Sequence, residues 1–183
     1  MLSASYRPIH QHLEKQVMNK NILLISICVS FFFSACQKKP DIDPAVAGLI
    51  FQAETAFRSG YYNASLAITD SALIISPHAT DIHFLRGRVF TRLARLDEAE
   101  ASYRTVLSLK PNYQGAWFNM GTTSIRRDDL PAAIAHYKNE MLLYPSARTM
   151  VQIGRAYAEL GKIDSASFAY EDAIKIDSKN AAA

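Results

Sequence analysis

The stretch RLDEAEASYRTVLSLKP, residues 95–111, decides the fold because its features return along the chain at a fixed interval. Its proline has counterparts 34 residues away in both directions. Four residue types recur at this interval to within one residue. They are Pro77, Pro111 and Pro145; Gly87, Gly121 and Gly154; Ala99, Ala133 and Ala166; Tyr103, Tyr137 and Tyr170. A period of this length predicts a chain built from repeated supersecondary units.

Each period holds two amphipathic helical patterns of about 14 residues, separated by a short turn. Asp97 and Asp164 stand where we expect N-caps, and Pro131 begins the corresponding helix of the third unit. The repeated prolines end each second helix. We place the turns inside the units at Gly60, Ala94, Asp128 and Gly161. Small residues let the two helices of a unit approach closely while the tyrosines fill the space between them: Ala53, Gly87, Gly121 and Gly154.

The pattern resembles the tetratricopeptide repeat, most clearly in AWFNMG (116–121) and GRAYAELGKIDSASFAYEDAIKID (154–177). The resemblance implies an all-α fold, a right-handed α-solenoid of four helix-turn-helix units. No unit can bury its apolar face alone, so the units have to stack. The predicted units are residues 46–79, 80–113, 114–146 and 147–180.

By the same period, residues 181–183 are expected to begin a fifth unit. The last predicted helix, Asp164 to Asp177, carries apolar side chains that a following helix would cover: Phe168, Tyr170, Ile174 and Ile176. Two interpretations stay open, of which we favour the first. The chain is a fragment of a longer protein, or this uncapped C-terminal helix is a contact surface for self-association.

An apolar run near the start, ILLISICVSFFF (22–33), is too short to span a membrane and has the length of a signal-peptide core. Lys20 precedes it, and the small residues Ser34 and Ala35 follow. Counted from Met18, the pattern predicts a signal peptide over residues 18–35, with residues 1–17 as an upstream extension. Residues 36–45, with two prolines and mixed charge, are predicted to form a tether.

The run Phe33-Ser34-Ala35-Cys36 resembles a bacterial lipobox, although leucine is common where Phe33 stands. The resemblance implies that a diacylglyceryl group is attached to Cys36, which anchors the protein to the bacterial cell envelope. Gln37 is not the aspartate that retains such lipoproteins in the inner membrane, so the outer membrane, facing the periplasm, is favoured. The alternative is a plain secretory signal cleaved after Ala35.

Charge and cysteine content exclude several classes of protein. Three of the 20 basic and one of the 17 acidic residues precede Phe31, so 17 basic side chains stand against 16 acidic ones from Cys36 onward. This balance gives no basic footprint for nucleic acid. The two cysteines, Cys28 and Cys36, lie in or just after the apolar run, so neither a disulfide framework nor a cysteine zinc site is expected in the repeats.

We find no catalytic constellation. His78 and His83 lie around a turn rather than one helical turn apart, and no carboxylate motif accompanies them. GTTS (121–124) lacks the lysine of a phosphate loop. We therefore predict a protein that is not an enzyme and that needs no cofactor and no metal.

The resemblance also implies that the first helices of successive units line a concave groove. Candidate groove residues form an arginine row beside an aromatic row: Arg58, Phe84, Arg88, Arg92, Phe118, Asn119, Arg126 and Arg155. Such a groove suits an extended peptide with acidic and apolar groups. The alternative is that these arginines form a solvated face, paired with nearby acids. The clamp that this family uses for chaperone C-termini is not supported, because only Asn119 fits it.

Two functions follow from these patterns. The first is a lipid-anchored envelope scaffold that binds a partner protein or peptide in its groove. The alternative is the recognition arm of a larger enzyme, a glycosyltransferase or protease, whose catalytic part lies beyond residue 183.

Overall fold

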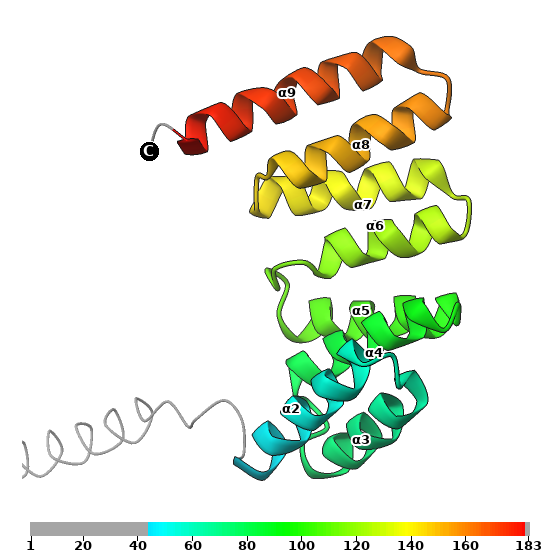
Figure 1. Cartoon of the computed structure of the whole chain (residues 1–183), viewed down its shortest axis with the longest axis vertical. Helices are drawn as coiled ribbons and strands as arrows, with labels where there is room; N and C mark the ends of the chain where they lie inside the picture. Colours follow the sequence, from blue (N-terminus) through cyan, green and yellow to red (C-terminus); the bar gives the residue numbers. More distant parts are fainter. Residues whose placement is uncertain (1–43, 182–183) are drawn as a thin grey trace, which may run out of the picture. The chain divides into compact units, whose positions relative to one another are not determined.

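The computed structural model describes residues 44–181, all but four of them with their side chains. The predicted signal peptide, Cys36 and nearly all of the tether lie outside the described residues. Eight α-helices and no strand occur in residues 44–181, which confirms the all-α prediction there (Figure 1). They are α2 (Pro44–Arg58), α3 (Tyr62–Ile75), α4 (Thr80–Arg92), α5 (Leu96–Leu109), α6 (Ala116–Arg126), α7 (Leu130–Leu143), α8 (Ala147–Glu159) and α9 (Ile163–Ala181).

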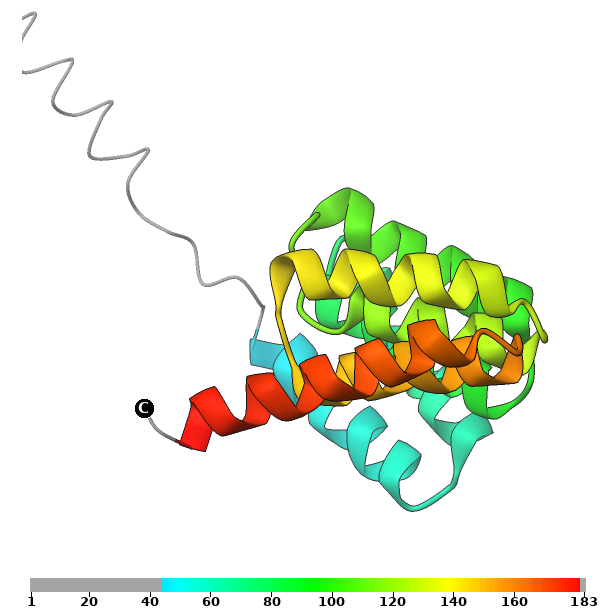
Figure 2. The same cartoon turned by 90° about the horizontal axis from the view of Figure 1, so that it is seen from above.

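The helices form four antiparallel pairs, α2/α3, α4/α5, α6/α7 and α8/α9, and each pair packs on the next. Seen from above, successive pairs are turned relative to one another, so the stack twists (Figure 2). The arrangement is a right-handed α-solenoid of four helix-turn-helix units, as predicted. Buried clusters join the units: one spans α2 to α6, and another spans α7, α8 and α9. The repeat region, residues 42–183, is a compact unit with its own core.

Within a pair, a glycine of the first helix packs against a tyrosine ring of the second. A Cβ atom on Gly87 would lie 2.5 Å from the Tyr103 ring, and one on Gly121 would lie 2.6 Å from the Tyr137 ring. Real Cβ atoms do not approach so closely, so only glycine allows this helix spacing. Tyr103 and Tyr137 are 0% and 1% exposed, which confirms the predicted role of these pairs.

The turns inside the four units share one conformation. Gly60, Ala94, Asp128 and Gly161 all have a left-handed φ, between 59° and 81°. The following residue donates its N–H back to the first helix in each case, for example Arg95 to the Phe90 carbonyl at 2.9 Å. This is the bonding of a Schellman turn, which satisfies carbonyls at the helix end. The predicted turn positions are therefore confirmed.

The predicted N-caps Asp97 and Asp164 are wrong. α5 begins at Leu96 and α9 at Ile163, so each aspartate lies inside the first turn. The Schellman turn leads directly into the next helix, which moves the start of that helix two residues earlier than an N-cap at the aspartate would give. Side-chain caps occur instead at Asp129, which accepts the Ala132 N–H at 3.0 Å, and at Ser146. Pro131 does lie in the first turn of α7, as expected.

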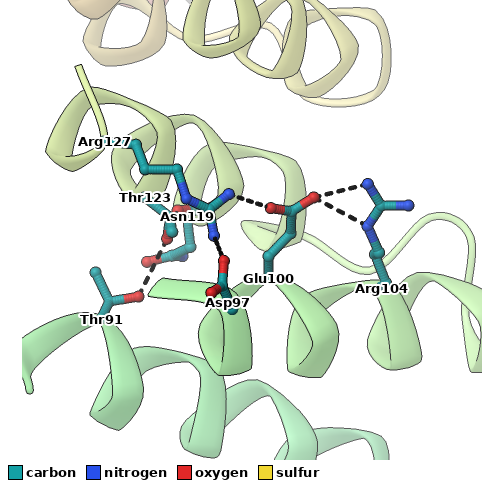
Figure 3. Close-up of polar contacts among 7 residues, drawn as sticks. All are labelled: Thr91, Asp97, Glu100, Arg104, Asn119, Thr123 and Arg127. Carbon is teal, nitrogen blue, oxygen red and sulfur yellow. Dashed lines mark hydrogen bonds and ion pairs between the residues drawn. The ribbon is translucent and has the colours of Figure 1, made fainter. Parts of the chain in front are cut away.

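Polar contacts tie the second unit to the third (Figure 3). Arg127, just after α6, forms ion pairs with Asp97 and Glu100 on α5, and Glu100 also pairs with Arg104 at 2.7 Å. Deeper in the same junction, the Thr91 and Thr123 hydroxyls lie 3.1 Å apart. These contacts help to fix the angle between the units, and hence the shape of the surface that their first helices share.

Candidate binding groove

A groove of about 640 Å³ runs along the first helices of successive units. Its walls come from α2, α4, α6 and α8, with additions from α7 and from the turns before α6 and α8. Six of the eight predicted residues line it: Phe84, Arg88, Arg92, Phe118, Asn119 and Arg126. The structure does not bring Arg58 and Arg155 into this lining. The Arg58 side chain is 77% exposed and pairs with Glu54 at 3.5 Å.

Two groove arginines lie on aromatic rings. The Arg88 guanidinium is 4.4 Å from the Phe57 ring centre and 6.0 Å from that of Phe84. The Arg148 guanidinium is 4.5 Å from the Phe118 ring centre. Stacking holds a guanidinium in place while leaving its N–H edge available to a planar anion such as a carboxylate. The groove therefore presents oriented donors next to apolar surface.

Arg92 and Arg126 differ from Arg88 in their acidic neighbours. Arg88 lies 4.0 Å from Glu54. Arg92 and Arg126, in contrast, form no ion pair within residues 44–181. The two thus stand in the groove as charges that the described part of the chain leaves uncompensated. Arg58 fits the alternative of a solvated, acid-paired face, whereas Arg92 and Arg126 are exposed but have no acid paired with them in the described residues.

Glu140 is the one acidic residue in the groove lining, and it is only 4% exposed. Its carboxylate accepts the N–H groups of Gly115 at 2.8 Å and Phe118 at 3.3 Å. These donors belong to the start of α6, where a helix dipole favours negative charge. Because the helix start engages this carboxylate, the four arginines of the lining outweigh it and the groove is electropositive.

The sequence analysis missed Glu140 and Arg148. Glu140 does carry a signal, because its repeat-equivalents are the buried residues Ala72, Val106 and Ala173. An acid within such an apolar ladder points to a specific buried contact. Arg148 carries no signal of this kind. Its equivalents in the other units share no chemistry with it, and its contact with Phe118 depends on how the third and fourth units stack.

The histidine and acidic residues of the described part of the chain form no metal-binding site. No cluster of three or more potential metal ligands occurs within 44–181. His83 uses its Nε2 to contact the Pro77 carbonyl at 2.8 Å, so it takes part in the turn between units. None of the helices described here has the length and apolar character needed to cross a membrane.

Comparison with known proteins matches two of the four units to a repeat family. Residues 80–113 and 147–180 match the family model described as tetratricopeptide repeat. These two segments are the second and fourth units of the array. Its fold resembles the crystal structure of MamA, with a TM-score of 0.70 at 19% identity over 75% of this chain and 81% of that one. It also resembles a thermophilic tetratricopeptide repeat protein of Thermus thermophilus, with a TM-score of 0.64 at 16% identity over 91% and 90% of the two chains. These likenesses concern the fold alone.

Two longer curated proteins resemble the repeats in sequence. A tetratricopeptide repeat and J domain-containing co-chaperone of Fusarium oxysporum is 28% identical over 124 residues, which is 66% of this chain and 24% of that protein. The human protein O-mannosyl-transferase TMTC1 is 27% identical over 93 residues, 49% of this chain and 10% of that protein. The match thus spans about a quarter of the first relative and a tenth of the second.

Proposed function

We propose that the repeat region is a non-catalytic adaptor that binds an extended segment of a partner protein in the groove. The observation that carries this proposal is the position of Arg92 and Arg126, which have no acidic partner in residues 44–181 and line the same groove as the rings of Phe84 and Phe118. Acidic side chains of the partner pair with the two arginines, since a guanidinium binds a carboxylate through two parallel N–H donors. Apolar side chains of the partner pack on the two rings.

The proposal is tested with residues 42–183 and fluorescein-labelled 12-residue peptides in which acidic and apolar residues alternate. Fluorescence anisotropy compares R92E/R126E with the control R58E/R155E, which changes the net charge equally but lies outside the groove lining. We expect R92E/R126E to weaken binding by about tenfold or more, about 1.4 kcal/mol, and the control to bind like the wild type. Equal loss in both variants would mean that only net charge attracts the peptides, and would refute the groove.

We further propose that the adaptor is held on a bacterial envelope membrane, facing the periplasm, by a diacylglyceryl group on Cys36. The support is the sequence pattern ending at that cysteine, which lies outside the described residues. Intact mass spectrometry of the native protein extracted from membranes is the test. A mass for a chain starting at Cys36 plus the lipid supports the anchor, whereas an unmodified Cys36 indicates the plain secretory signal.

A second candidate function is the recognition arm of a larger enzyme. Both curated relatives are much longer than their matched parts, and one is named as a transferase. The outer face of α9 is also open among the described residues, with Ile163 63% and Ile174 70% exposed. A native mass far above that of residues 36–183 would favour this function.

We also propose that two copies associate through the same open face of α9, the contact expected from the uncapped C-terminal helix. Sedimentation velocity of residues 42–183 over a range of concentrations tests it. A mass that rises with concentration, and that Ile174→Glu returns to the monomer value, supports contact through α9. A constant monomer mass would refute it.

A further inference from the structure

A second surface lies on the side of the second helices. We use the word furrow for the position between neighbouring second helices, above the first helix of the later unit, which packs against both and is called the floor. The repeat gives three such positions, between α3 and α5, between α5 and α7, and between α7 and α9. Their lining positions correspond through the 33- or 34-residue spacing, so the three can be compared residue by residue.

The chain's own side chains occupy the first two furrows. In the first, Arg86 of α4 reaches Asp70 of α3 at 3.2 Å, and its guanidinium lies 5.4 Å from the Phe90 ring centre. In the second, Trp117 of α6 stacks on His136 of α7, with ring centres 5.6 Å apart and planes 25° from parallel. Each pair bridges the floor helix and a wall helix.

The lining of the third furrow has neither an ion pair nor a stacked pair of rings among the described residues, and only Lys138 of α7 approaches a ring of the floor helix, Tyr157. Met150 and Ala169 stand at the positions of Trp117 and His136, and Ile153 stands at the position of Arg86. The result is a cavity of about 770 Å³ between α7, α8 and α9, lined almost entirely by apolar groups. Two of its apolar lining residues are largely exposed, Leu142 at 83% and Phe168 at 62%.

Lys138, the cation of the cavity lining, has no acidic side chain paired with it in the described residues. The Lys138 ammonium lies 5.7 Å from the Tyr157 ring centre and forms no ion pair within residues 44–181. Asp164, the acid of the lining, likewise has no ion pair there. Lys138 lies in the cavity lining next to Tyr157, so an anionic group on a ligand whose apolar part enters the furrow can reach it.

We propose that the third furrow binds an aromatic side chain of a partner protein, with an acidic residue next to it in the partner. In the second furrow this position is taken by two stacked rings, the indole of Trp117 and the imidazole of His136. An aromatic side chain therefore suits the equivalent position in the third furrow. Replacing that pair by methionine and alanine frees the corresponding space, and methionine adapts its shape to aromatic guests. The furrow shares no lining residue with the groove, so this binding site goes beyond the proposed function.

The probe for the test is indole-3-acetate, which combines an indole with a carboxylate. Binding to ¹⁵N-labelled residues 42–183 is followed by NMR titration. We expect saturable shifts of backbone amides in the furrow, at Tyr157 and Ala169 among others. M150W/A169H, which rebuilds the pair of the second furrow, should weaken binding about tenfold. Ile74→Trp adds an exposed tryptophan to α3 instead and should leave binding unchanged.

Lys138→Gln tests the charge. It should weaken indole-3-acetate a few-fold, in keeping with an exposed ion pair, and leave the neutral 3-methylindole unaffected. If M150W/A169H does not fold, Met150→Trp alone serves as the filled variant. Unchanged binding in the filled variant, or shifts confined to the groove around Phe84 and Phe118, would overturn the proposal. So would furrow shifts that appear on raising the protein concentration alone, because a second copy would then be the occupant.

Discussion

The seam between the two helices of a unit and the groove lie on the same first helices, yet they follow different rules. In the seam one pair recurs with the same identity, as Gly87–Tyr103 and Gly121–Tyr137, because the helix spacing depends on it. In the groove, Arg92 and Arg126 are followed at the equivalent position of the fourth unit by Glu159. Buried repeat positions are constrained by packing, whereas exposed ones are free to specify a partner.

The largest expected effect lies in the seam. Gly121→Ala places a Cβ 2.6 Å from the Tyr137 ring, and we expect a loss of about 2 kcal/mol in the free energy of unfolding. The control Gly48→Ala lies in α2 with nothing within 4 Å of the new atom, and should gain up to about 1 kcal/mol in helix propensity. Urea unfolding followed by circular dichroism measures both. If the two variants have equal free energies of unfolding, the position of Gly121 is not constrained by packing against Tyr137.

Glu140 lies in the groove lining but is buried and hydrogen-bonded, so we expect it to be constrained by packing as the seam residues are. Glu140→Gln weakens two charge-assisted hydrogen bonds at the start of α6, so we expect a loss of about 1–2 kcal/mol in unfolding free energy. Glu159→Gln, which changes an exposed acid, should have no measurable effect. Thermal unfolding of both variants is the measurement. If Glu140→Gln leaves the free energy of unfolding unchanged, Glu140 belongs with the positions that packing does not constrain.

Arg127 joins units through contacts at the surface. Arg127→Gln removes its pairs with Asp97 and Glu100, and since Asp97 is 99% exposed we expect a loss of at most about 1 kcal/mol. The loss should shrink in 1 M salt, which screens exposed pairs. Arg104→Gln removes a pair within α5 only and is the control. An Arg127→Gln effect that salt does not reduce would indicate a packing role instead.

The smallest effect concerns His136, which stacks on Trp117. Burial lowers the pKa of His136, partly opposed by Glu100 on α5 and supported by Arg104. The unfolded chain therefore binds the proton more readily than the folded one, so stability should be full above the ordinary histidine pKa and decline as pH falls through it. Urea unfolding at pH 7.5 and pH 5 tests this, with His136→Asn as control. A decline of equal size in the control would assign the pH dependence to other groups.

The structural features that recur with the 34-residue period could be predicted from the sequence. The helices, the turn positions inside the units and the glycine–tyrosine seam all recur, and the structure contains them. The starts of α5 and α9 were misplaced by two residues, because Asp97 and Asp164 favour a cap while the preceding turn already sets the helix. Arg148 could not be predicted, since its contact with Phe118 arises between units and does not repeat.

The last helix, α9, also differs from what the repeat pattern alone would predict. The tyrosine ladder is uniform in sequence, yet Tyr170 is 37% exposed where Tyr137 is 1% exposed. Burial of such a residue depends on the helix that packs over it, and a repeat pattern alone does not report that neighbour.

Site-specific photocrosslinking in cells shows whether the partner protein lies in the groove. A benzophenone amino acid at Asn119 lies in the groove lining, and one at Arg104 lies on α5, where the side chain is 70% exposed. We predict a crosslinked partner from position 119 that disappears in the R92E/R126E background, and none from position 104. A partner captured from position 104, or one from position 119 that persists in R92E/R126E, would contradict the account.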